Sequence, residues 1–306
     1  MGAPIAILSD FAFPGLCFGA VCLLVTCAAT KLPPFNSLEK WEKKLGCAVC
    51  CTALLNASVV SWPALEALYA IWNTWSGMSH FSCDSVNILN VQAPQGAILA
   101  CGLTCGYFMQ DSLVMTLYPK ETTKELGGAA AYKIMWMHHI VSLIVWPYAM
   151  LNGVGAIFVI QNLSTEITNA RAPLRLATRS LHSSAAVLTT CAPDDMHAGS
   201  VCLATWQVGQ NLFLLARSEI FGSGAELPIG IAWMASFFVF RIIPMPFVLY
   251  VWLMTVLTPG CAGLTIGEWV VAAVTVPIPQ ALNSFWFYKI VRGAIKKMNK
   301  GKQAAS

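Results

Sequence analysis

The sequence predicts an all-α polytopic membrane protein with about seven transmembrane helices. Of its 306 residues, 57% are hydrophobic and only 10% are charged, whereas charged residues make up about a quarter of a soluble domain. The apolar residues are grouped in stretches that are long enough to cross a bilayer as helices, with polar segments between them. The net charge is +4, and the basic residues lie at the ends of these stretches. This distribution excludes a basic face for binding nucleic acid.

The individual spans follow from the apolar stretches. No basic residue precedes or lies within the first span, and Lys31 is the first one in the sequence. This pattern is typical of an uncleaved membrane anchor rather than of a cleaved signal peptide. The sixth is interrupted by Arg241, Pro244 and Pro246. Residues 176–210 are rich in Ser, Thr and Ala and are interpreted as a loop. The expected spans cover residues 4–28, 46–74, 95–117, 135–152, 156–175, 228–257 and 267–288.

The basic residues predict the orientation of these spans. With seven spans, every Lys and Arg except Arg241 falls in or beside the loops on one side of the membrane. By the positive-inside rule the N-terminus is expected to be non-cytosolic and the C-terminus cytosolic. The chain then divides into an N-terminal helix with its connector at 1–38, a main domain at 39–300 with an inserted loop at about 176–210, and a cytosolic tail end at 301–306.

Two adjacent histidines in the fourth span, His138 and His139, are the main functional clue. A neutral imidazole costs less to bury in a membrane than a lysine, so it can serve there as a base, a nucleophile or a ligand. Neighbouring residues of a helix point about 100° apart, so one ring could face a cavity and the other a neighbouring helix. A purely structural hydrogen bond across the bundle is the alternative.

Other polar side chains are expected at a similar depth. Asp111, in the third span, lies about as far from the cytosolic side as the two histidines, and Tyr107 projects from the same helical face. Each charge left facing lipid costs about 2.5–3.5 kcal/mol, so these groups should face inward. They form either a structural salt-bridge cluster or a polar cavity for a lipid headgroup. The remaining members of the set are Glu166, Asn169, Arg171, Arg175, Arg241 and Asn283.

Five motifs follow one another along the chain: GYFMQD at 106–111, HHIVS at 138–142, the Glu and Arg segment at 166–175, FFVFR at 237–241 and LNSFWFYKIVRGAIKK at 282–297. With these motifs in this order, the chain resembles the TLC domain family, which includes ceramide synthases and translocon-associated membrane proteins. The resemblance implies six spanning helices around a central cavity, with the first helix as an addition, and a location in the endoplasmic reticulum. It covers about residues 39–300.

The chain departs from ceramide synthases at one point. Those enzymes carry a His-Asp pair on the helix after the paired histidines, whereas this chain reads FVIQNLSTEIT at 158–168. It is therefore more similar to the TLC domain-containing proteins of lipid homeostasis. Residues 176–210 also depart from the family, which connects these helices briefly, and represent either a lineage-specific loop or a translated intron.

Three functions are open at this point. In an acyl-CoA-dependent acyltransferase, a neutral histidine would deprotonate the acceptor or take the acyl group, Asp111 would orient the ring, and Arg171 and Arg175 would attract CoA phosphates. A lipid-binding regulator of membrane composition would use the same cavity without chemistry, and a trafficking adaptor would use the loops. The expected partners are membrane lipids and acyl-CoA as co-substrate, with a homodimer left open. No nucleic acid, metal or permanently bound cofactor is expected.

Overall fold

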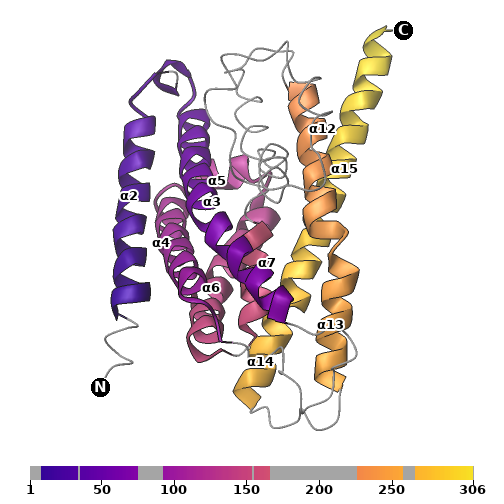
Figure 1. Cartoon of the computed structure of the whole chain (residues 1–306). Coiled ribbons are helices and arrows are strands. Elements are labelled where there is room, and N and C mark those ends of the chain that lie inside the picture. The colour runs from indigo at the N-terminus through magenta and orange to yellow at the C-terminus, as the bar shows by residue number, and fades with distance from the viewer. Residues whose placement is uncertain are drawn as a thin grey trace, which may run out of the picture.

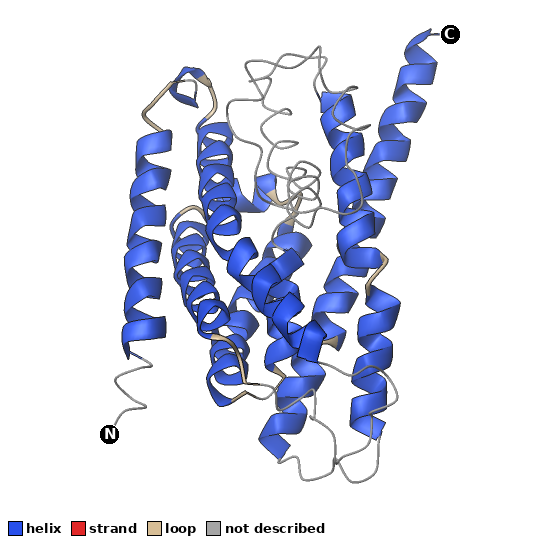
Figure 2. Cartoon of the chain, viewed as in Figure 1, coloured by secondary structure: helices blue, strands red, loops and turns tan. Residues whose placement is uncertain are grey.

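A computed structural model describes residues 8–33, 35–74, 92–153, 155–165, 226–257 and 266–305. Within these ranges the elements are all helical and form an elongated bundle (Figure 1, Figure 2). Six of the described helical stretches are long and apolar enough to cross a membrane. The all-α, polytopic membrane class is thereby confirmed. These stretches are Ser9–Ala29, Trp41–Ile71, Gln95–Leu117, Ala129–Asn152, Ile229–Met254 and Trp269–Ile295.

The helices follow the expected order of spans. A shorter apolar helix, α7, begins at Ala156, where the fifth span was expected; the rest of that span and the loop at 176–210 lie outside the described residues. The described elements are η1 (Leu8–Ala12), α2 (Phe13–Ala29), η2 (Phe35–Ser37), α3 (Trp41–Thr74), α4 (Gln95–Leu117), α5 (Pro119–Glu125), α6 (Ala129–Asn152), α7 (Ala156–Thr165), α12 (Glu226–Phe237), η6 (Phe238–Ile242), α13 (Met245–Leu257), α14 (Ile266–Thr275) and α15 (Pro277–Ala305).

Helix boundaries match the apolar stretches where proline or glycine marks them. α4 covers the expected residues because Pro94 precedes it and Pro119 opens the next helix, α5. α6 begins at Ala129, earlier than expected, directly after Gly127 and Gly128, whose φ values of 82° and 120° are accessible mainly to glycine. The expected span began at residue 135, after Lys133, whereas the apolar span of the structure includes the first turns of α6.

Two polar segments that were expected to be connectors are helical. α3 begins at Trp41 instead of at residue 46, and residues 119–125 form α5. Lys124 on α5 donates to the Glu42 carboxylate on α3 at 2.6 Å, and this contact raises the pKa of Lys124. Charged residues that face water do not oppose helix formation, so these turns continue the helices beyond the apolar region.

The described helices in the C-terminal half of the bundle show two breaks. The π-helix η6 and the bend at Ile243 and Pro244 separate α12 from α13, at the position where Arg241 and the prolines predict an interruption. A single non-helical residue, Val276, separates α14 from α15, because Pro277 cannot donate to the preceding turn. α15 then continues through the basic segment to Ala305, so the described part of the expected tail end is also helical.

The core lies between α3, α4, α6 and α7, in the middle of the bundle (Figure 1). Many of its buried residues are small, which allows close helix contact where lipid provides no hydrophobic drive for association. α2 lies at one edge of the bundle, and α12, α13 and α15 lie at the other. α2 and α15 run in the same direction, so the start of α2 and the end of α15 lie at opposite ends of the bundle (Figure 1).

Candidate functional site

The centre of the candidate site is a contact between Asp111 on α4 and His139 on α6. The carboxylate Oδ2 of Asp111 lies 3.5 Å from the Nε2 of His139. Both residues are buried, with 8% and 2% of their surface exposed. The other ring nitrogen of His139, Nδ1, is buried without a hydrogen-bond partner in the described part of the chain. The pair therefore joins two spans in the core and leaves one imidazole nitrogen available.

Aromatic rings hold the two histidines in different directions. The Phe108 ring, on α4, lies 4.8 Å from the His139 ring and 5.4 Å from the His138 ring, measured between centroids. Trp146 packs against Phe108 at 5.5 Å and lies 6.4 Å from His138. His139 is thus directed at Asp111 on α4, while the His138 ring lies between Phe108 of α4 and the cleft formed with α14 and α15. This division agrees with the angle of about 100° between helical neighbours.

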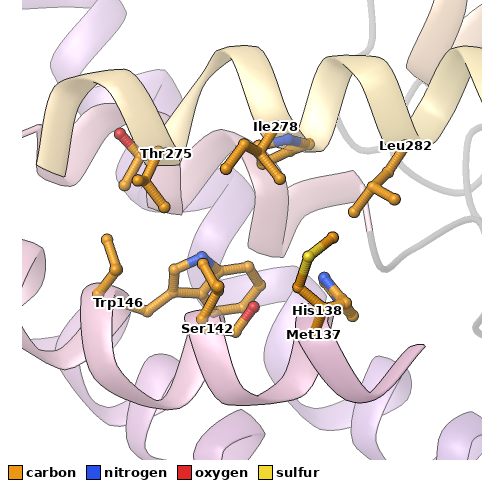
Figure 3. A pocket seen from close by; sticks show the side chains of 11 residues that line it. Met137, His138, Ser142, Trp146, Thr275, Ile278 and Leu282 are labelled. Carbon is orange, nitrogen blue, oxygen red and sulfur yellow. The ribbon is translucent and has the colours of Figure 1, made fainter. Parts of the chain in front are cut away.

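His138 lines a narrow cleft between α6 and the helices α14 and α15. Figure 3 shows Met137, His138, Ser142 and Trp146 of α6 opposite Thr275, Ile278 and Leu282. The cavity measures about 10 Å³, which is room for about one water molecule. Its lining residues are Met137, His138, Val141, Ser142, Val145, Trp146, Val274, Thr275, Ile278, Pro279 and Leu282.

The two walls of the cleft differ in polarity. On the α6 side, Ser142 follows His138 by one helical turn, so the hydroxyl and the imidazole share a face. On the opposite wall the side chains are aliphatic except for Thr275, whose hydroxyl donates to the carbonyl of Val271 at 2.8 Å. The cleft therefore has one hydrogen-bonding wall and one apolar wall.

Arg241 and Asn283, two other expected site residues, are in contact with each other. The guanidinium of Arg241 donates to Asn283 Oδ1 and to the carbonyl of Thr165, both at 3.2 Å, and lies 5.3 Å from the centre of the Phe237 ring. These bonds connect η6, α15 and α7. Neither Arg241 nor Asn283 lines the cleft. In this conformation the arginine joins three helices near the site without facing the cavity.

The remaining expected residues are distributed unevenly. Tyr107 packs against the core, with its ring 5.7 Å from that of Phe108. Glu166, Asn169, Arg171 and Arg175 lie outside the described residues. Among the described residues, no group of three or more His, Cys, Asp or Glu side chains could hold a metal ion.

Of the residues that line the cleft, only His138 belonged to the expected set; Ser142, Trp146 and Thr275 are examples of those that were missing. The i, i+4, i+8 spacing from His138 would have identified Ser142 and Trp146 as sharing its helical face. Thr275 carries no comparable signal, because its place in the cleft depends on how α14 packs against α6. Periodicity within one helix is visible in a sequence, whereas the identity of the facing helix is not.

Comparisons with known proteins identify a family but no individual relative. A family model described as the TLC domain matches residues 47–292, which is most of the chain and contains Asp111, both histidines and the C-terminal helices up to Arg292. The match begins after α2, within α3. Searches of curated proteins and of solved structures found no match.

Proposed function

Because the chain belongs to the TLC domain family, we propose that this integral membrane protein binds a membrane lipid in the cleft beside His138, in the membranes of the endoplasmic reticulum. The observation that carries the proposal is the arrangement of three neighbouring groups. A buried carboxylate and imidazole are paired between Asp111 and His139, and the adjacent His138 lines the cleft. Intramembrane ionisable groups that face the interior mark binding or transport sites by default.

The polarity of the cleft supports a lipid as the ligand. A lipid has hydrogen-bonding groups next to hydrocarbon, which matches one wall with His138 and Ser142 and one with Ile278 and Leu282. His138 can donate or accept a hydrogen bond in its neutral form, and the Ser142 hydroxyl can do both. A soluble polar metabolite would leave the aliphatic wall unmatched.

Binding requires the cleft to widen, since it now has room for about one water molecule. The break between α14 and α15 lies directly beside the cleft-lining Thr275. A short non-helical point of this kind can absorb a change in backbone angle while the helices on either side stay intact. We therefore expect the ligand to separate α6 from α14 and α15, rather than to enter a preformed cavity.

Acyl transfer is the second candidate function, and the contact between Asp111 and His139 favours it. In this reaction an imidazole nitrogen attacks the carbonyl of an acyl-CoA thioester, the C–S bond breaks, and CoA leaves as the thiol with a proton. A lipid hydroxyl or amine then attacks the acyl-imidazole, the C–N bond breaks, and the proton of the acceptor passes to the imidazole. A carboxylate beside the ring stabilises the positively charged acyl-imidazolium that forms in the first step before its proton passes to CoA.

The binding proposal is tested with the full-length protein in nanodiscs of phosphatidylcholine that contain a photoactivatable phosphatidylcholine with a diazirine in one acyl chain. We expect cross-links to peptides that contain residues 137–146 and 274–282, and fewer cross-links for His138→Ala. Ile144→Ala is the matched control, because Ile144 lies on the same helix but is 67% exposed. Cross-links confined to exposed residues, with no effect of His138→Ala, would contradict binding in the cleft.

Acyl transfer is tested by incubating the same nanodiscs with a long-chain acyl-CoA and a membrane lipid extract. We expect release of free CoA thiol with stoichiometric formation of an acylated lipid, and loss of both for Asp111→Asn. Lipid binding without thiol release would leave the protein as a binding protein and exclude this second function.

A further inference from the structure

α2 touches α4 along the backbone, through two pairs of glycines. An ideal Cβ on Gly15 would lie 2.5 Å from the carbonyl oxygen of Gly102, and one on Gly19 would lie 2.7 Å from that of Gly106. Both separations are shorter than the 3.0 Å that real Cβ atoms keep. The two helices run in the same direction, so a GxxxG segment of one faces a GxxxG segment of the other. Only glycine permits this approach.

Hydrogen bonds on either side of the glycines connect α4 with η1, which runs directly into α2, and with α2 itself. The amide Nε2 of Gln95 donates to Asp10 Oδ2 at 2.6 Å, before the glycines along both chains. The amide Nε2 of Gln110 donates to the hydroxyl of Thr26 at 3.2 Å, after them. Both Thr26 and Gln110 are 4% exposed, and the Thr26 hydroxyl donates in turn to the carbonyl of Cys22 at 3.0 Å. The contact is therefore fixed in distance by the glycines and in register by polar bonds.

Gln110 directly precedes Asp111. Because neighbouring residues on a helix point about 100° apart, α4 presents Gln110 to α2 and Asp111 to His139 on α6. A rotation of α4 about its axis would move both side chains together. The bond between Gln110 and Thr26 opposes such a rotation, while the glycine contact prevents α4 from moving away from α2.

We propose that α2 is a positioning element for the contact between Asp111 and His139, and that Thr26 and Gln110 are its positioning residues. α2 precedes the region that the TLC domain model matches, so the matched residues alone do not supply this support. The inference concerns the geometry of the pair. It rests on the proposed function only in taking this pair as the working site, and its test does not require lipid binding.

The alternative is that α2 only adds stability to the bundle. The two explanations differ in what happens to His139 when the Thr26 hydroxyl is removed without a change in shape. Thr26→Val keeps the branched side chain but cannot accept from Gln110. If α2 sets the rotation of α4, His139 should lose its close contact with Asp111 and become more accessible. If α2 only adds stability, His139 should stay as protected as the rest of the core.

The test measures the rate at which diethyl pyrocarbonate modifies each histidine of the full-length protein in phosphatidylcholine nanodiscs, read by peptide mass spectrometry. For Thr26→Val we expect modification of His139 to become about two- to tenfold faster, the range that corresponds to one neutral hydrogen bond. We expect an unchanged rate for His138 and only a small fall in melting temperature, because the buried Gln110 amide loses its partner. Thr26→Ser, which restores the hydroxyl, should return His139 to the wild-type rate.

Two controls make the result decisive. Leu24→Ala alters α2 at a side chain that is 70% exposed and should leave His139 unchanged. Asp111→Asn removes the charge from the pair directly and should accelerate modification of His139, which shows that the readout reports on the pair. Acceleration for Asp111→Asn without any for Thr26→Val would overturn the inference, as would a uniform rise at both histidines with a lower melting temperature. Failure of the lipid cross-linking experiment would reject the proposed function and leave this result standing.

Discussion

The carboxylate of Asp111 and the imidazole of His139 face each other across the interface of α4 and α6 at 3.5 Å, while the histidine that lines the cleft is His138. The ring beside the carboxylate and the ring beside the cavity are therefore different. A ligand at His138 would therefore act on the buried pair indirectly, through the contact between the two histidine rings, whose centroids are 5.6 Å apart, and through Phe108, which contacts both rings. Direct chemistry at His139 would require the cleft to extend toward its free Nδ1.

Removing the charge of Asp111 separates a chemical role of the pair from a packing role. Asp111→Asn keeps the shape and one hydrogen-bonding oxygen, so we expect a stability change below about 1.5 kcal/mol. It should nevertheless lower lipid cross-linking or acyl transfer, because the carboxylate no longer orients the ring of His139. His139→Ala should have the same functional effect. Melting temperature and lipid labelling are measured on the same samples, and wild-type labelling in both variants would mean that the pair serves packing alone.

Arg241 should contribute to stability through its two bonds. Its guanidinium reaches Asn283 and the Thr165 carbonyl from one planar group, which a lysine ammonium cannot reproduce in the same geometry. Arg241→Lys is therefore expected to destabilise the protein by about 1–3 kcal/mol, the cost of losing bonds to a charged group. Thermal unfolding in detergent measures this. Arg292→Lys is the control, because Arg292 is exposed and its guanidinium bonds Tyr288 at 3.3 Å; equal losses for both variants would contradict the prediction.

The sequence predicts those features of the fold that a single helix encodes. α4 was expected over its observed residues because an apolar stretch ends at prolines on both sides, and the interruption near Arg241 follows from Pro244 and Pro246. Asp111 and the histidines were expected at one depth from their distances to the ends of their spans, and the contact between Asp111 and His139 agrees with that depth.

Features that depend on the choice of neighbouring helix were not predicted. Gly15 and Gly106 each belong to a GxxxG segment, a spacing that indicates close packing of membrane helices. Nothing in either segment, however, says that α2 and α4 are each other's partners. The start of α3 at Trp41 was missed because hydropathy measures the apolar region and not the length of the helix. The direction of Arg241 depends in the same way on where α7 and α15 lie.

The orientation of the bundle in the membrane is a further prediction. α2 and α15 run in the same direction, so the chain enters and leaves the described bundle at opposite ends (Figure 1). Lys289, Arg292 and the lysines that follow lie in the second half of α15, which the positive-inside rule assigns to the cytosolic side. A tag after residue 306 should be digested when protease is added to sealed microsomes, whereas a tag before residue 1 should be protected. A protected C-terminal tag would reverse the assignment.

The last prediction concerns occupancy of the cleft itself. Val274 lines the cleft opposite α6, and the cavity is small enough for one larger side chain to fill it. Val274→Phe should therefore reduce cross-linking of the photoactivatable phosphatidylcholine to the α6 peptide that contains His138, with a stability cost of about 1–3 kcal/mol from overpacking. Val270→Phe is the matched control, since it makes the same change on α14 at a residue that is 54% exposed. Leu282→Ala, which enlarges the cleft from α15, should have the opposite effect and increase cross-linking. Equal labelling of the α6 peptide in the Val274 and Val270 variants would show that the lipid contacts α6 from outside the bundle.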